Sequence, residues 1–327
     1  MGMIERPRRL RSTAKLRAMV RDTNVSPSSL ILPIFIREGL TSPKPISGMP
    51  GVDQHTKESF KAEIEKAMHA GIGGVMIFGI PEERDVMGSQ ALNPKGVLST
   101  AIRDARNIAG DELVIAADLC LDEFTSHGHC GVLDTQGSID NDATLKIYGQ
   151  MATILAQSGA HMVGTSGMMD GQVGVVRRAL DSSGFTDVLI LAYAAKFASA
   201  FYGPFRGAVE SQLEGNRNTY QQDPGNIKES LREVRLDVSE GADIVMVKPG
   251  IAYLDILYAT TQAVDIPTAS YIVSGEMAML EAAAAQGSID RERAILEVLS
   301  SVKRAGASVI CTYWAIEAAE LLGKNFG

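Results

Sequence analysis

The segment Asp243-Ile244-Val245-Met246-Val247-Lys248-Pro249-Gly250 is a short run of apolar, mostly β-branched side chains that ends in a lysine, a proline and a glycine. Apolar residues at successive positions, rather than at alternate ones, are typical of a parallel strand that is buried on both faces. Seven similar runs occur elsewhere in the 327-residue chain. The eight predicted strands are Leu30–Ile36, Gly74–Ile80, Leu113–Cys120, His161–Ser166, Val188–Tyr193, Asp243–Gly250, Pro267–Ser274 and Ser308–Trp314.

Segments with helical periodicity alternate with these strands. Several of them end at a glycine, which favours the end of a helix. A strand followed by a helix, repeated eight times, predicts an α/β protein with a (β/α)8 TIM barrel. The alternative is an open doubly wound sheet, which is disfavoured because no glycine-rich phosphate loop follows the first strand. The predicted helices are Lys57–Ala70, Lys95–Ala109, Asp142–Ser158, Gln172–Ser182, Asn226–Glu240, Tyr253–Ala263, Arg291–Arg304 and Ala315–Leu322.

Two segments lie outside this repeat. Residues 1–29 precede the first strand and contain arginines and prolines, so they form an N-terminal arm that is either disordered or packed on a neighbouring subunit. Residues 30–327 then form the barrel. The connection after the fifth strand, at about residues 197–225, is rich in Gly, Pro, Tyr, Gln and Arg. A connection of this length is usually a lid or a binding loop, and we expect it to cover the active site.

Composition excludes several classes of protein. The formal net charge of −8 argues against a nucleic acid or an anionic membrane as a partner. Apolar runs such as Val188–Ala195 are too short to span a bilayer, and no apolar segment follows the N-terminal arginines as in a signal peptide. Three cysteines do not make a disulfide framework. These features predict a cytoplasmic protein.

The carboxyl ends of barrel strands carry the active site in this fold, and two lysines occur there. Lys248 ends an apolar strand, and Lys196 follows the strand that ends at Tyr193. Burial lowers the pKa of a lysine from about 10.4 and so yields a free amine that can attack a carbonyl. Alternatively, Lys248 pairs with a carboxylate and Lys196 extends to solvent. Two lysines on consecutive strands favour the reactive reading, because each raises the cost of charging the other.

A candidate metal site follows the third strand. Cys120, Asp122 and Cys130 offer two thiolates and a carboxylate, a ligand set that suits zinc with an open coordination position. Buried free thiols are the alternative reading of the same spacing. His127 and His129 lie in this loop, and we interpret them as polar loop residues rather than as ligands.

Longer motifs resemble the porphobilinogen synthase family, also called 5-aminolaevulinate dehydratase. The resemblance runs from Arg6–Leu10 to the end of the chain and carries the motifs in the family's order. The motifs are Ser126–Leu133 (SHGHCGVL), Asp140–Leu145 (DNDATL), Met169–Val173 (MDGQV), Lys196–Arg206 (KFASAFYGPFR), Met246–Gly250 (MVKPG) and Val273–Glu276 (VSGE).

The resemblance implies the condensation of two 5-aminolaevulinate molecules to porphobilinogen with loss of two waters, an early step of haem and other tetrapyrrole synthesis. Each lysine would form a Schiff base with one substrate. Ser274 and Tyr313 would hold the carboxylate of the substrate on Lys248. The substrate on Lys196 would be held by Arg206 and Arg217 of the lid, helped by Gln221. Asp118, Ser166 and a metal-bound water would assist proton transfer. Taken singly, these arginines and hydroxyls are equally typical of solvated or structural residues.

The resemblance also implies metals and an oligomer. Zinc-dependent members of the family have three cysteines in the metal loop, whereas this chain has Asp122 at the middle position. We predict zinc, bound less tightly than by three cysteines. Many bacterial relatives bind a second ion, magnesium, near the residue that corresponds to Glu233, although a solvated carboxylate is the alternative there. The family forms an octamer through its N-terminal arm, which would explain residues 1–29.

Two other functions are compatible with parts of the sequence. A class I aldolase-type lyase also uses a Schiff-base lysine in a barrel, but it needs neither the second lysine nor the cysteine loop. A catalytically inactive barrel, kept for metal binding or assembly, would not need both lysines, both lid arginines and Tyr313.

Overall fold

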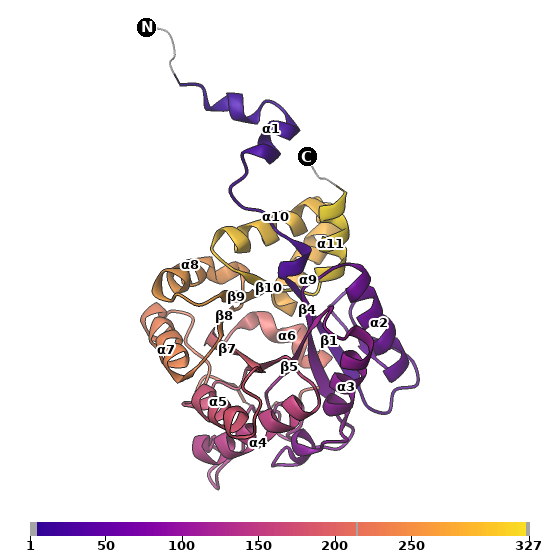
Figure 1. Ribbon diagram of the computed structural model, residues 1–327, viewed down its shortest axis with the longest axis vertical. Helices are drawn as coiled ribbons and strands as arrows, with labels where there is room; N and C mark the ends of the chain where they lie inside the picture. The colour runs from indigo at the N-terminus through magenta and orange to yellow at the C-terminus, as the bar shows by residue number, and fades with distance from the viewer. Residues whose placement is uncertain (1–4, 214, 325–327) are drawn as a thin grey trace.

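The computed structural model describes residues 5–213 and 215–324 of the chain. Parallel strands form a barrel at the centre of the molecule, and helices surround it (Figure 1). The barrel is closed because β10 pairs with β1, with Leu30 opposite Ile310. The TIM-barrel prediction is therefore confirmed, and the open doubly wound sheet is excluded. The barrel strands are β1 (Leu30–Arg37), β4 (Gly74–Ile80), β5 (Val114–Asp118), β6 (Met162–Thr165), β7 (Leu189–Lys196), β8 (Ile244–Lys248), β9 (Thr268–Tyr271) and β10 (Val309–Cys311).

The strands are buried on both faces, as their continuous apolar runs predict. Every residue of β4 and β8 is buried. Inside the barrel the packing leaves little space: a β-carbon placed on Gly164 of β6 would lie 3.1 Å from side-chain atoms of Met76 and Tyr193. The interior is thus a packed core, and a cavity is expected only at its ends.

Each predicted helix is present, two with the predicted bounds and the others with ends shifted by one or two residues. Several begin at a side chain that accepts a main-chain N–H, as Asp140, Asn226 and Asp290 do. These helices pack around the barrel (Figure 1). They are α2 (Lys57–His69), α3 (Val97–Ala109), α4 (Asn141–Gln157), α5 (Gln172–Ser182), α7 (Ile227–Glu240), α8 (Leu254–Ala263), α10 (Arg291–Arg304) and α11 (Ala315–Gly323).

Most strand ends differ from the prediction by one to three residues, and two of these differences affect the site. The fifth barrel strand, β7, continues past Tyr193 to Lys196, with an irregular register between Ala192 and Ala195, so Lys196 lies on the strand. The seventh, β9, ends at Tyr271, and residues 274–285 form helix α9 (Ser274–Ala285). We did not predict α9 because its sequence is rich in alanine and has no alternation of apolar and polar faces.

The lid and the start of the barrel contain further short elements. The lid, residues 197–213 and 215–225, contains a 3-10 helix η4 (Ala200–Tyr202) and helix α6 (Gly203–Ala208), neither of which was predicted from the sequence. Residue 214 lies outside the described residues. A hairpin of β2 (Lys44–Pro45) and β3 (Asp53–His55) pairs with β1 and was also missed.

The N-terminal arm extends away from the barrel (Figure 1). It contains η1 (Pro7–Arg11) and α1 (Ala14–Met19), neither of which has a buried residue, and it reaches β1 through η2 (Pro27–Ser29). Residues 1–4 of the arm lie outside the described residues. Across residues 5–213 and 215–324, no helix combines the length and apolarity needed to cross a membrane.

The contact between β4 and α3 predicts that Gly79→Ala lowers the free energy of unfolding by roughly 1–3 kcal/mol. A β-carbon at Gly79 would lie 2.6–2.9 Å from Leu98, including its main chain, so the helix would have to shift. Thermal or denaturant unfolding measures the effect. Gly207→Ala in α6 is the matched control, because no atom lies within 4 Å of a β-carbon there. Equal stability of the two variants would contradict the prediction.

Candidate active site

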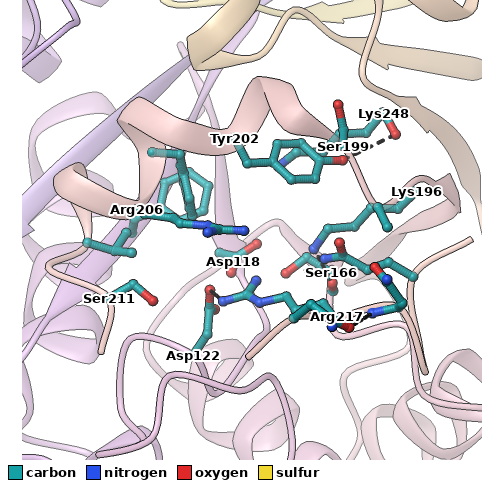
Figure 2. A pocket seen from close by; sticks show the side chains of 17 residues that line it. Asp118, Asp122, Ser166, Lys196, Ser199, Tyr202, Arg206, Ser211, Arg217 and Lys248 are labelled. Carbon is teal, nitrogen blue, oxygen red and sulfur yellow. Dashed lines mark hydrogen bonds and ion pairs between the residues drawn. The ribbon is translucent and has the colours of Figure 1, made fainter. Parts of the chain in front are cut away.

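A cavity of about 170 Å³ lies at the carboxyl ends of the barrel strands, under the lid. Both predicted lysines line it, together with Asp118, Ser166 and residues of the lid. Figure 2 shows these side chains facing one another across the cavity. The structure thus brings residues from β5, the β6–α5 connection, β7, β8 and the lid to one place.

Lys248 lies among aromatic rings. Its side chain is 5% exposed, and its Nζ lies 4.1 Å from the ring centre of Tyr271, 5.1 Å from that of Tyr193, 5.3 Å from that of Phe205 and 5.6 Å from that of Tyr202. The rings attract a cation but also exclude the water that would solvate it. Burial, followed by the charge of the neighbouring Lys196, lowers the pKa of Lys248 to about 8, against the opposing effect of Asp118.

Lys196 has more polar surroundings than Lys248. The two lysines are directly opposite each other in the pairing of β7 and β8. The Nζ of Lys196 donates a hydrogen bond to the main-chain oxygen of Ser166 at 2.6 Å. It lies 5.7 Å from the ring centre of Tyr193, so this ring lies near both amines. The two amines therefore share one cavity but differ in what surrounds them.

Asp118 ends β5 and also faces the cavity. Burial, followed by the negative charge of Asp122, raises the pKa of Asp118 to about 7, while Lys196 and a hydrogen bond with Ser166 oppose the rise. Its Oδ1 is buried and has no hydrogen-bond partner among the described residues. A buried oxygen without a partner is costly, which makes this atom a candidate to contact a ligand.

The three predicted metal ligands lie together. One ligand atom from each of Cys120, Asp122 and Cys130 can be chosen so that all lie within 4.8 Å of one another, and all three residues are buried. Zinc bonds sulfur at about 2.3 Å and oxygen at about 2.0–2.2 Å, so small side-chain shifts would bring the three atoms onto one ion. Two sulfurs and a carboxylate oxygen fit zinc better than magnesium.

Charge in this cluster is distributed unevenly. Burial raises the pKa of the Cys120 thiol well above its usual value. Burial also opposes ionisation of Cys130, but the hydrogen bond from Cys120 and the charge of Arg217 lower the pKa of this thiol. For Asp122 the charge of Arg217 outweighs burial and holds the pKa well below its usual range. Asp122 is therefore the constant anion of the cluster.

Arg217 and Gln221 of the lid present unused donors to the cavity. The Nη2 atom of Arg217 donates to Asp122 Oδ2 at 2.8 Å, as Figure 2 shows, and to the main-chain oxygen of Gly128 at 2.9 Å. The Nε of Arg217 and the Nε2 of Gln221 are buried, and neither has a partner among the described residues. Arg206 lines the same cavity. Such a set of donors suits an anionic ligand such as a carboxylate.

Ser274 and Tyr313 do not line the cavity that the two lysines share. The hydroxyl of Ser274 accepts a hydrogen bond from the main-chain N–H of Phe205 at 3.0 Å. The hydroxyl of Tyr313 lies 3.2 Å from that of Tyr271. Ser274 and Tyr313 thus contact Phe205 and Tyr271, whose rings lie near Lys248. They are near the site but do not line its cavity.

Glu233 lies in a different place, on α7, where it lines a second cavity of about 540 Å³ with Asp170 and Glu229. Burial, and then the charge of Asp170, raises the pKa of Glu233. Asp237, one turn further along α7, is half-buried, and its pKa is raised to about 8 by burial and by the charges of Glu240 and Glu233. Acidic groups that repel one another in this way can accommodate a cation.

Sequence reasoning missed two kinds of residue in the site. The tyrosines near Lys248 were not predicted, although Tyr193 and Tyr271 stand at or near the ends of strands, as the two lysines do. Glu123 was overlooked as well. It is buried beside Asp122, and burial raises its pKa well above the usual value. Its position next to a predicted ligand was the available signal.

The lid lies directly on the loop that carries the cysteines, which we call the cysteine loop (residues 119–133). Besides the bonds of Arg217, the hydroxyl of Tyr220 lies 3.0 Å from His129 Nδ1 and accepts from the main-chain N–H of Cys130 at 3.4 Å. Gly128 has a φ of +69°, and a β-carbon there would lie 2.5 Å from the main-chain nitrogen of Leu213. The two segments therefore fit closely only because residue 128 has no side chain.

Known proteins resemble this chain over almost its whole length. A family model described as delta-aminolevulinic acid dehydratase matches residues 4–321. The delta-aminolevulinic acid dehydratase of Streptomyces coelicolor is 58% identical over 319 residues, which cover 97% of each chain. That of Mycobacterium tuberculosis is 54% identical over 317 residues, which cover 96% of each chain. The crystal structure of delta-aminolevulinic acid dehydratase (porphobilinogen synthase) from Toxoplasma gondii ME49, in complex with the reaction product porphobilinogen, is also similar. Its TM-score is 0.94 and its identity 43%, with 98% of this chain and 92% of that chain covered.

The contact at Gly128 predicts that Gly128→Ala opens the lid. The added methyl group would force Leu213 away, at a cost of roughly 1–3 kcal/mol, so the population with an open lid rises roughly 5- to 150-fold. Limited proteolysis, with the cut sites mapped to residues 203–222, measures this. Gly137→Ala is the matched control: Gly137 has a φ of +80°, but no atom lies within 4 Å of a β-carbon. If both variants are cut at the same rate, backbone strain rather than the lid contact is responsible.

Proposed function

Because this chain belongs to the delta-aminolevulinic acid dehydratase family and is accordingly a lyase, we propose that it joins two molecules of 5-aminolaevulinate through Schiff bases on Lys196 and Lys248. The product is porphobilinogen, and two waters are released. The observation that carries this proposal is the placement of two buried lysines, opposite each other on adjacent strands, in one cavity. An aldolase-type reaction would need only one of them.

Lys248 is suited to attack a ketone because its pKa of about 8 leaves a substantial fraction of free amine near neutral pH. The amine adds to the carbonyl carbon, and the carbonyl oxygen leaves as water. The resulting iminium withdraws electrons from the adjacent carbon, which then loses a proton more easily. In the proposal, Ser274 and Tyr313 hold the carboxylate of this substrate. The hydroxyl of Ser274 can keep its bond from the Phe205 N–H, while its own proton would turn from the main-chain oxygen of Phe201, 3.5 Å away, to the carboxylate.

Lys196 holds the second substrate in the same manner. Arg206, Arg217 and Gln221 would bind its carboxylate, and the buried unpaired donors of Arg217 and Gln221 support this assignment. Asp118 and Ser166 lie beside the amine of Lys196 and would pass protons to and from the reacting atoms. The donors on the lid bind the carboxylate from one side while the strand holds the amine, so the substrate is fixed at both ends.

A zinc ion held by Cys120, Asp122 and Cys130 would supply Lewis-acid chemistry at the edge of this cavity. Asp122 then has two tasks, because its carboxylate also binds Arg217. Glu233 is the proposed site of a magnesium ion with a structural role, and the neighbouring Asp170 supports it.

The remaining parts of the proposal concern the cell and the assembly. We assign the reaction to tetrapyrrole synthesis leading to haem, in the cytoplasm, by a homo-octamer. The N-terminal arm, residues 1–29, would contact a neighbouring subunit while residues 30–327 form the catalytic barrel with its lid at about 197–225. The lack of buried residues in η1 and α1 supports this role for the arm, because its apolar side chains Leu10 and Met19 are exposed.

Incubation with 5-aminolaevulinate is expected to yield porphobilinogen, measured by its colour with Ehrlich's reagent. Borohydride added during turnover should fix substrate to the protein, and mass spectrometry should find it on Lys248 and Lys196. Lys248→Ala should abolish the Lys248 adduct and lower the rate by at least about two orders of magnitude. Lys146→Ala, at an exposed position of α4, is the control and should change neither. The absence of product and of any adduct would refute the proposal.

Removal of zinc is expected to abolish activity. A zinc chelator should inactivate the enzyme, and added zinc but not magnesium should restore it, because two sulfur ligands favour the softer ion. The metal content of the purified protein is the accompanying measurement. Asp122→Cys should bind zinc more tightly, since it adds a third thiolate. A protein that is free of zinc and fully active would contradict this assignment.

A further inference from the structure

One buried carboxylate binds the main chain immediately after Lys248. Pro249 has no N–H, and the N–H groups of residues 250–252 all donate to Glu276, at 3.2, 2.6 and 3.2 Å. A fourth bond comes from the N–H of Val273 at 2.9 Å. Thus every main-chain donor in the four residues that follow Lys248 is bound by a single side chain.

Glu276 is 0% exposed, and its carboxylate forms no ion pair with any described residue. A buried carboxylate without compensation costs several kcal/mol, so its four N–H partners are what make this position tolerable. Three of those donors belong to η5 (Ile251–Tyr253) and the residue before it, just ahead of α8. The positive end of a helix favours an anion there. The buried carboxylate therefore depends on these N–H groups for stabilisation, and the N–H groups depend on the carboxylate as their acceptor.

The position of this contact matters because pairing between β8 and β9 stops before Lys248. The last pair on that side joins Val247 to Ser270. On the other side, β7 still holds Lys248, because the N–H of Phe197 donates to its main-chain oxygen at 3.0 Å. Glu276 thus replaces the missing strand pairing: through Val273 it holds the end of β9, and through residues 250–252 it holds the end of β8.

We propose that Glu276 is a positioning residue for Lys248: it fixes the chain end from which the amine projects into the cavity. The inference rests on the proposed role of Lys248 as a Schiff-base lysine. Glu276 does not touch the substrate, and it acts only by holding the main chain. A displacement of about 1 Å at a reacting group lowers a rate by up to two orders of magnitude, so a small relaxation of this loop has a measurable effect.

Lys196 provides an internal reference, because different groups hold it. Its main-chain oxygen accepts from the N–H of Gln222 at 3.0 Å, and its Nζ donates to the main-chain oxygen of Ser166. Loss of the Glu276 contacts should therefore slow the reaction of Lys248 and leave that of Lys196 almost unchanged. A general loss of stability would affect both lysines together.

The test is borohydride trapping of 5-aminolaevulinate, with the adducts on the two lysines counted by peptide mass spectrometry after a short reaction. In Glu276→Gln an NH2 group replaces one carboxylate oxygen, and this group cannot accept hydrogen bonds from the main-chain N–H groups. The ratio of Lys248 to Lys196 adducts should fall about tenfold or more. Glu281→Gln is the matched control on the same helix. Its carboxylate binds Arg291 and the Nε1 of Trp314, away from the lysines, so the ratio should not change.

Both adducts form in the same folded molecules, so a smaller folded fraction does not alter the ratio of Lys248 to Lys196 adducts. If Glu276→Gln does not fold, Glu276→Asp keeps the charge but withdraws it by one methylene, and the same ratio should fall to a lesser degree. An unchanged ratio in the variant, with both adducts present in the unmodified protein, overturns this inference alone. If the unmodified protein gives no adduct at either lysine, it is the proposed function that fails.

Discussion

Two amines that repel each other when charged lie side by side, buried at the carboxyl ends of the barrel strands, and much of the surrounding structure follows from this arrangement. Parallel pairing of β7 and β8 sets Lys196 opposite Lys248, and both residues are buried. Aromatic rings surround one amine, whereas a main-chain oxygen accepts a hydrogen bond from the other. A buried amine is costly to charge, and the second amine adds to that cost.

Elements with a local sequence signal were predicted correctly, whereas structural features that depend on distant partners were not. The eight strands could be read from the sequence because burial on both faces leaves a continuous apolar run. Helix α9 could not, because its alanines give no periodic signal. The end of β7 was also placed too early: the irregular pairing after Ala192, which allows the strand to continue to Lys196, involves the partner strand β8. Strand type was thus predictable, but strand ends were less so.

The same division applies to the site. The cysteine loop was found from a short motif, and its three predicted ligands lie together. The hydrogen bond between Asp122 and Arg217 joins residues far apart in the chain, so no local sequence pattern predicts it. The contacts of Ser274 with Phe205 and of Tyr313 with Tyr271 likewise depend on how α6 and β9 pack, which the sequence does not reveal. Family resemblance supplied the roles of these residues, but not the contacts that they make.

The different surroundings of the two lysines bear on a problem of symmetry. The proposed reaction consumes two copies of one compound, yet each copy must end in a different part of the product. The substrate cannot supply that distinction, so it has to come from the protein. Around Lys248 the cavity is lined by aromatic rings. Near Lys196 it is lined by polar groups, among them the hydrogen-bond donors of Arg217 and Gln221. The two identical substrate molecules would then take different roles because the side chains around the two lysines differ.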